Sequence, residues 1–323
     1  MVRFTKRKSA FLSMMMAAMV LLAGCGGGNQ AASTEQPAAA PAGDSYTVKH
    51  NMGETTIKGI PQRVVVLTTQ GVETVLALGV KPVGAVSSFS ADQFYDHVKG
   101  ELEGVKVVGT ETQPNLEAIA ALKPDIILGM TMRHEKIYKQ LSAIAPTVFA
   151  EKPRGDWKEN FKLYAEALNK KTEGEKVIGD WEKRIASFKE KAGVKLHTKV
   201  SLVRFMPGKV RIYYKDTFAG VILKELGFAR PEAQDKEEFA AEVTKERIPE
   251  MDGDILFYYV YETGDSKASQ LEQEWTNDAL WKNLNVVKNN KAYKVDDVIW
   301  NTSGGVKSAN LLLNELEKVF LTK

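Results

Sequence analysis

Apolar residues along the chain fall into short continuous runs separated by stretches with helical periodicity. In the first half, the runs lie at residues 64–67, 83–86, 105–108, 125–128 and 147–149. Continuous apolar runs of this length are typical of strands buried on both faces of a parallel sheet. Amphipathic segments lie between them, at residues 72–78, 116–123, 135–144 and 157–168. This alternation predicts an α/β layer structure.

The second half follows the same order. Strand-like runs lie at residues 200–205, 210–214 and 255–260, and helical patterns at 218–226, 245–251 and 306–320. Residues 115–126 also align with residues 244–255, so that Glu117 matches Glu246 in the first turn of a predicted helix that precedes a strand. We therefore predict two related lobes, at residues 45–171 and 193–323.

Residues 172–192 lie between the two halves and predict one long helix. Thr172 and Glu175 have the spacing of a capping box, and Gly193 is a suitable end. An apolar stripe recurs at helical spacing, at Val177, Ile178, Trp181, Ile185 and Phe188. An ordinary surface helix would have the same pattern. The position of residues 172–192 between two matching halves favours a connecting helix about 30 Å long.

The first 24 residues have the features of a signal peptide. Four cations precede an apolar run, residues 10–23, that is too short for a permanent membrane span. The sequence Leu-Ala-Gly-Cys at residues 22–25 resembles a bacterial lipobox, which implies that Cys25 is lipidated and that residues 25–44 form a flexible linker. A plain secreted protein is the alternative. Cys25 is the only cysteine, so the chain has no internal disulfide.

Charge and hydropathy restrict the partners of the mature chain. Removing the four leader cations and no acids brings the formal net charge from +3 to −1. We therefore expect no nucleic-acid partner. No second long apolar run follows the leader, so we expect a soluble body that lipid holds at the outer face of the cytoplasmic membrane.

Candidate ligand residues lie on loops that follow predicted strands, where open α/β lobes bind their ligands. The loops at residues 87–91, 261–267 and 297–304 are among those expected to line a cleft between the lobes. Arg133 follows the run 125–128, Arg211 shares a predicted strand face with Tyr213, and Trp300 precedes a polar, glycine-containing loop. The planar fork of an arginine suits carboxylate and hydroxamate oxygens. Arg204 competes with Arg211 for the position that faces the cleft, and a surface arginine or a core tryptophan is the plain alternative.

Sequence signals of an enzyme or of a direct metal site are absent. The chain has no GxGxxG after a predicted strand, and no GxxxxGK[ST], GxSxG or HExxH. Its four histidines, His50, His97, His134 and His197, are scattered, and only His134 lies on a predicted cleft loop. We expect no catalysis and no metal bound directly by protein ligands.

Five segments together carry a family resemblance. They lie at residues 72–86, 114–128, 132–148, 211–228 and 281–308. On these segments the chain resembles the helix-linked, two-lobed substrate-binding lipoproteins of Gram-positive ABC importers for iron(III) siderophores. It is most similar to receptors for citrate-hydroxamate siderophores such as schizokinen and arthrobactin. The resemblance implies two Rossmann-like lobes joined by a single long helix, with the ligand in a cleft between them.

The same resemblance implies roles for particular residues. Arg133 and Arg211 would hold the anionic ferric complex, with Tyr213 and Trp300 beside it, and the siderophore itself would hold the iron without a cofactor. Glu117 and Glu246 would dock on arginines of a membrane permease that works with a cytoplasmic ATPase. The receptor would be a monomer. A receptor for haem, cobalamin or a catecholate siderophore is the nearest alternative, and an extracytoplasmic α/β enzyme is the alternative from another class.

Overall fold

The computed structural model describes residues 45–89, 93–153 and 155–322. The predicted signal peptide, Cys25 and the linker lie outside these residues. Within the described ranges, none of the helices combines the length and the apolar character that a membrane span requires.

The first sheet is parallel and has the strand order β5-β4-β3-β6-β7. Its strands confirm the five apolar runs of the first half: β3 (Val64–Val66), β4 (Gly84–Ser87), β5 (Lys106–Thr110), β6 (Ile126–Met130) and β7 (Thr147–Ala150). Alternate strand residues enter two different core clusters, with Val64 on one face and Val65 on the other. Burial on both faces explains why these strands are apolar throughout. A hairpin of β1 (Ser45–His50) and β2 (Gly53–Lys58), which the sequence pattern did not predict, precedes them.

Helices of the first lobe follow its strands. The four predicted helical patterns correspond to α1 (Thr69–Ala77), α3 (Leu116–Ala121), α5 (Tyr138–Ile144) and α6 (Trp157–Ala167). Two single-turn helices, α2 (Asp96–Lys99) and α4 (Thr131–His134), were not predicted. The starts of α1, α2 and α4 all lie beyond the carboxyl end of a strand, which is the edge that carries the site described below.

The second sheet is mixed and has the strand order β10-β9-β8-β11-β12. Strands β8 (Val200–Met206), β11 (Ile255–Val260) and β12 (Ala292–Lys294) are parallel. Strands β9 (Lys209–Tyr213) and β10 (Ala240–Val243) run antiparallel to their neighbours. A turn at Gly208, where φ is +75°, joins β8 to β9 and leaves no room for a crossover helix. The second lobe therefore does not copy the topology of the first.

Helices of the second lobe are α8 (Phe218–Leu226), α9 (Lys267–Thr276), α10 (Ala279–Asn283), α11 (Asn285–Lys288) and α12 (Val306–Phe320). The predicted helix at 245–251 is a 3₁₀ helix, Lys245–Met251, and contains Pro249. Residues Val298–Thr302 form one π-helical turn. Helices α8 and α12 have the bounds that the sequence pattern predicted.

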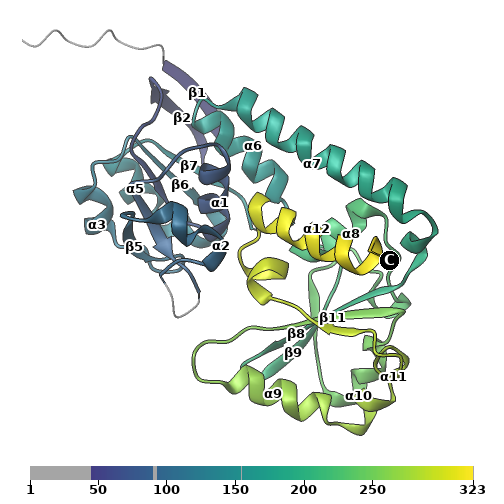
Figure 1. Ribbon diagram of the computed structural model, residues 1–323. Helices are drawn as coiled ribbons and strands as arrows, with labels where there is room; N and C mark the ends of the chain where they lie inside the picture. Colours follow the sequence, from purple (N-terminus) through teal and green to yellow (C-terminus); the bar gives the residue numbers. More distant parts are fainter. Residues whose placement is uncertain (1–44, 90–92, 154, 323) are drawn as a thin grey trace, which may run out of the picture. The chain divides into compact units, whose positions relative to one another are not determined.

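Helix α7 (Lys171–Ala192) confirms the long helix predicted between the halves (Figure 1). On one side it packs on α6, where the Trp157 and Trp181 rings meet edge to face at 5.3 Å. On the other side its Arg184 donates to the side chains of Asn310 and Asn314 on α12, each at 2.7 Å. The helix therefore contacts elements of both lobes along its length, whereas the lobe limits at residues 171 and 193 stay a prediction.

The start of α7 corrects one prediction. Its N-cap is Lys170, which makes no capping hydrogen bond through its side chain, and Thr172 lies inside the first turn. The reason is the tight turn from α6: Asn169 adopts the left-handed conformation at φ +54°, and α7 begins two residues later. The predicted capping box is therefore wrong. The predicted end at Gly193 is confirmed, with φ +51°.

The aligned segments 115–126 and 244–255 have equivalent structural roles at their aspartates. Asp125 accepts from the backbone N–H of Arg63, at 2.8 Å, just before β3. Asp254 accepts from the backbone N–H of Lys199, at 2.7 Å, just before β8. In each lobe, an aspartate that directly precedes one strand therefore fixes the backbone at the start of the neighbouring strand: Asp125 precedes β6, which pairs with β3, and Asp254 precedes β11, which pairs with β8.

Candidate functional site

A cavity of about 250 Å³ lies where loops of the two lobes meet. Phe89 and Tyr95 line it from the first lobe, and Tyr261, Asp297 and Thr302 line it from the second. Three of the loops that the sequence predicted for a cleft, at residues 87–91, 261–267 and 297–304, contribute to it. The cavity is therefore the candidate ligand site.

Arg204 lies buried in the second-lobe wall of this cavity. Its Nε and Nη2 donate to the two carboxylate oxygens of Asp297 at 2.6 and 2.9 Å, in the two-pronged geometry that arginine and carboxylate prefer. Nη1 donates to the Tyr213 hydroxyl at 3.0 Å, and Nη2 also contacts the Thr302 hydroxyl at 2.9 Å. The guanidinium carbon lies 4.6 Å from the centre of the Tyr261 ring.

These contacts keep Arg204 charged despite its burial. Burial by itself lowers the pKa of Arg204, but the Asp297 carboxylate and the Tyr213 hydroxyl together raise that pKa above its ordinary value. The side chain is only 5% exposed, and Asp297 balances its charge. Arg204 therefore supports the wall of the cavity rather than offering a free cation to it.

Arg211 lies directly opposite Arg204 in the β8–β9 pairing, so both side chains leave the same face of the sheet. The two residues are neighbours that differ in exposure, and which of them contacts a ligand stays a prediction. The Arg211 side chain is 27% exposed, and its one ion pair, with Glu242, is loose at 3.7 Å. Arg211 is therefore the more accessible arginine of this pair.

Arg133 occupies the corresponding edge of the first lobe, on α4 directly after β6. Its side chain is 29% exposed, and its Nε lies 3.4 Å from the buried carboxylate of Glu111. The other oxygen of Glu111 accepts from the backbone N–H of Thr69, at 3.0 Å, where α1 begins. Glu111 thus orients Arg133 and stabilises the positive end of a helix at the same time.

Tyr95 lies close to the charged groups of both walls. Burial raises its pKa well above the ordinary value, and the negative charges of Glu111 in the first lobe and Asp297 in the second raise it further. Its hydroxyl accepts from the backbone N–H of Phe89 at 3.3 Å. The phenol therefore stays neutral and can offer its proton to an acceptor in the cavity.

Two predicted ligand residues are fully buried. Tyr213 is 0% exposed and supports Arg204 through its hydroxyl, while its ring packs at 5.4 Å against that of the partly exposed Phe239. Trp300 is also 0% exposed; it stacks on Phe257 at 4.5 Å and donates from Nε1 to Glu315 at 2.5 Å. Direct contact of either side chain with a ligand stays a prediction.

The two predicted docking glutamates are both exposed. Glu117 lies in the first turn of α3, whose N-cap, Asn115, accepts from the Ala118 N–H at 2.9 Å. Glu246 lies in the first turn of the 3₁₀ helix, and a hydrogen bond from Thr244 lowers its pKa. Both side chains are accessible, as docking would require.

His134, the histidine expected on a cleft loop, is a buried structural residue. Its Nδ1 accepts from the Met130 backbone N–H at 3.1 Å, and its Nε2 donates to the Glu111 carbonyl at 2.8 Å. Burial lowers its pKa, which favours this neutral form. Among the described residues, no group of three or more histidines, cysteines or acids is placed to hold a metal ion.

Sequence reasoning missed Tyr95, Glu111 and Asp297, although Asp297 lies on a loop expected at the cleft. One usable signal was Arg204, a charged residue inside the apolar run 200–205. A charge in a buried strand requires a partner. That partner, Asp297, is 93 positions away in the sequence, and no local pattern identifies it.

Comparison with known proteins places the fold. A model of the periplasmic binding protein family matches residues 64–298. The chain belongs to this family. It is 51% identical over 284 residues to YfiY of Bacillus subtilis (strain 168), named a probable siderophore-binding lipoprotein, with 85% of this chain and 87% of the relative covered.

Two further relatives of this family member cover most of its length. The Fe(3+)-citrate-binding protein YfmC of B. subtilis (strain 168) is 33% identical, with 86% of this chain and 87% of the relative covered. The crystal structure of Staphylococcus aureus SirA complexed with staphyloferrin B is 37% identical, with a TM-score of 0.79 and coverage of 84% of this chain and 97% of SirA. The α/β fold with two lobes is therefore that of known binding proteins.

Proposed function

We propose that this chain is the substrate-binding lipoprotein of an ABC importer and that it captures a ferric siderophore between its lobes. The observation that carries the proposal is one partly exposed arginine in each lobe, Arg133 on α4 directly after β6 and Arg211 on β9 beside Arg204. Each is held by a carboxylate of its own lobe and keeps further N–H donors for an anionic ligand. The names of YfiY, YfmC and the SirA complex support the same class of ligand.

We further infer that the ligand is of the citrate-hydroxamate type. Carboxylate and hydroxamate oxygens accept from the planar fork of an arginine, and the neutral Tyr95 adds one more donor. Phe89, Tyr261 and Phe239 offer aromatic surface to the linker arms of such a chelate. The siderophore supplies all ligands to the iron, and the protein performs no covalent chemistry on it.

Delivery requires a membrane and a permease. Lipidation of Cys25 would hold the monomeric receptor at the outer face of the cytoplasmic membrane. Glu117 and Glu246, exposed in corresponding turns of the two lobes, would then dock on basic residues of the permease, which a cytoplasmic ATPase drives. Docking would give a role to Glu117 and Glu246, which belong neither to the core nor to the lining of the cavity.

Titration calorimetry of the purified protein with ferric schizokinen, ferric citrate, a ferric catecholate and haem tests the proposal. We expect the tightest binding for ferric schizokinen. Arg133→Ala and Arg211→Ala should each weaken it at least tenfold, or about 1.4 kcal/mol. Arg247→Ala is the matched control, because Arg247 pairs with Glu250 outside the cavity. Unchanged affinity in both arginine variants would falsify the site, and tightest binding of haem would replace the ligand class.

A further inference from the structure

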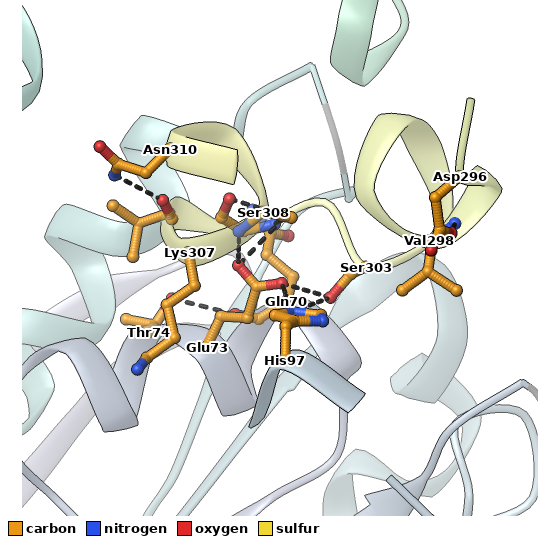
Figure 2. A network of polar contacts seen from close by, with 12 residues as sticks. Gln70, Glu73, Thr74, His97, Asp296, Val298, Ser303, Lys307, Ser308 and Asn310 are labelled. Carbon is orange, nitrogen blue, oxygen red and sulfur yellow. Dashed lines mark hydrogen bonds and ion pairs between the residues drawn. The ribbon is translucent and has the colours of Figure 1, made fainter. Parts of the chain in front are cut away.

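A buried carboxylate of the first lobe holds the start of the last helix of the second lobe. Glu73 lies on α1, and its side chain is 0% exposed. One oxygen accepts from the backbone N–H of Ser308 at 2.8 Å and lies 3.1 Å from the Ser308 hydroxyl. The other accepts from His97 Nε2 at 2.7 Å and from the Ser303 hydroxyl. We call these four residues the interlobe junction (Figure 2).

The interlobe junction is closely packed as well as hydrogen-bonded. Gly305 passes so near Glu73 that an added Cβ would lie 2.6 Å from the Glu73 Oε2 and 2.7 Å from the Glu73 Cβ. The carboxylate also faces the N-terminus of α12, a helix of 15 residues, where a negative charge is stabilised. Lys307 adds a second link between the lobes, with Glu101 at 2.6 Å.

This cluster contains a serine, a histidine and an acid, but its geometry is not that of a nucleophilic relay. His97 faces both Glu73 and Ser303 with the same nitrogen, Nε2, at 2.7 and 3.4 Å. A relay needs the acid and the hydroxyl on opposite ring nitrogens. The arrangement joins two lobes and activates no hydroxyl.

The junction lies directly behind both walls of the ligand cavity. His97 stacks on Tyr95, the first-lobe wall, with the ring centres 6.0 Å apart. Ser303 follows Thr302, which lines the second-lobe wall and contacts Arg204 and Asp297. One carboxylate therefore sets the position of both walls.

We propose that Glu73 is a positioning residue for ligand capture: it fixes the spacing of Tyr95 and Thr302 across the cavity without touching the ligand. This inference rests on the proposed function of the cavity. Because the cavity walls are held before a ligand arrives, binding need not order them. Losing the carboxylate should then weaken binding of a ferric siderophore chiefly through faster dissociation.

Two variants disturb the junction in different ways. Glu73→Gln removes the charge and replaces one acceptor oxygen by a donor, which faces other donors. Gly305→Ala keeps the carboxylate but inserts a methyl group against it. Ile119→Val is the control, because it trims the core of the first lobe on the sheet face away from Glu73 and lowers thermal stability without touching the junction. Stopped-flow and equilibrium binding of ferric schizokinen, melting temperatures, and amide hydrogen exchange of residues 303–308 are measured for all three.

We expect Glu73→Gln and Gly305→Ala to weaken binding at least tenfold and to speed exchange at residues 303–308, while Ile119→Val keeps wild-type affinity. Wild-type affinity in both junction variants overturns the inference. The inference also fails if the loss of affinity is proportional to the drop in melting temperature across all three variants, because a general loss of stability would then explain the weaker binding. If the wild type binds no ferric siderophore, the proposed function fails. Hydrogen exchange in the ligand-free protein then still tests the role of Glu73: unchanged protection of residues 303–308 in Glu73→Gln would show that Glu73 does not hold this segment.

Discussion

Replacing Asp297 by asparagine should destabilise the protein by an amount that the structure allows us to estimate. Asp297 and Arg204 are 7% and 5% exposed, and they share two hydrogen bonds. Removing one partner of a buried ion pair leaves an uncompensated charge, which typically costs about 3–5 kcal/mol. Asparagine keeps one acceptor oxygen, and Arg204 keeps the Tyr213 and Thr302 hydroxyls, so we expect the lower end, about 3 kcal/mol.

Differential scanning calorimetry measures this effect. For a chain of this size each kcal/mol corresponds to about 2–4 °C, so the melting temperature should fall by about 6–12 °C. Asp235→Asn is the matched control, because Asp235 pairs with Lys215 at the surface, where an ion pair contributes about 0–1 kcal/mol. If the two substitutions lowered the melting temperature equally, the inference that Arg204 depends on Asp297 would be refuted.

Three more predictions follow from the structure. Reversing Glu117 and Glu246 together to arginine should leave siderophore binding intact but stop iron uptake by cells; normal uptake would remove their docking role. Stability should fall as the pH drops below about 6.5, because the pKa of His134 is lowered in the folded state and the unfolded chain takes up the proton first, by at most about 1.4 kcal/mol per pH unit. Urea unfolding should show a shallower pH slope in His134→Gln. The small-angle scattering profile should change little when ligand binds, because α7 and the contacts of Glu73 both limit movement of the lobes relative to one another. A large change in the profile would show that they do not.

The site shows how far residue types alone can lead. The pattern pointed to Arg133 and Arg211, since a charged residue in or beside an apolar run is visible locally; contact of either with a ligand stays a prediction. It had no means of showing that Trp300 packs on Phe257 and donates to Glu315, 43 and 15 positions away. Side-chain direction at a loop depends on what packs against it, and that is a property of the whole fold.

The amino-acid sequence by itself determined the elements that periodicity and local chemistry control. The apolar runs became β3 to β7, β8 and β11, because burial on both sheet faces requires continuous apolar side chains. Gly79 and Gly227 follow the ends of α1 and α8 at φ +72° and +86°, a left-handed backbone conformation that glycine adopts readily.

Only the tertiary structure decided the contacts that join distant segments. The β8–β9 register placed Arg204 beside Arg211, and Asp297 then neutralised one of them and not the other. Glu73 accepts a hydrogen bond from the backbone N–H of Ser308, 235 positions away in the sequence. Hydrogen bonds and ion pairs act over a few ångströms in space, whatever the separation along the chain, so the composition of the cavity walls follows from the fold and not from any local pattern.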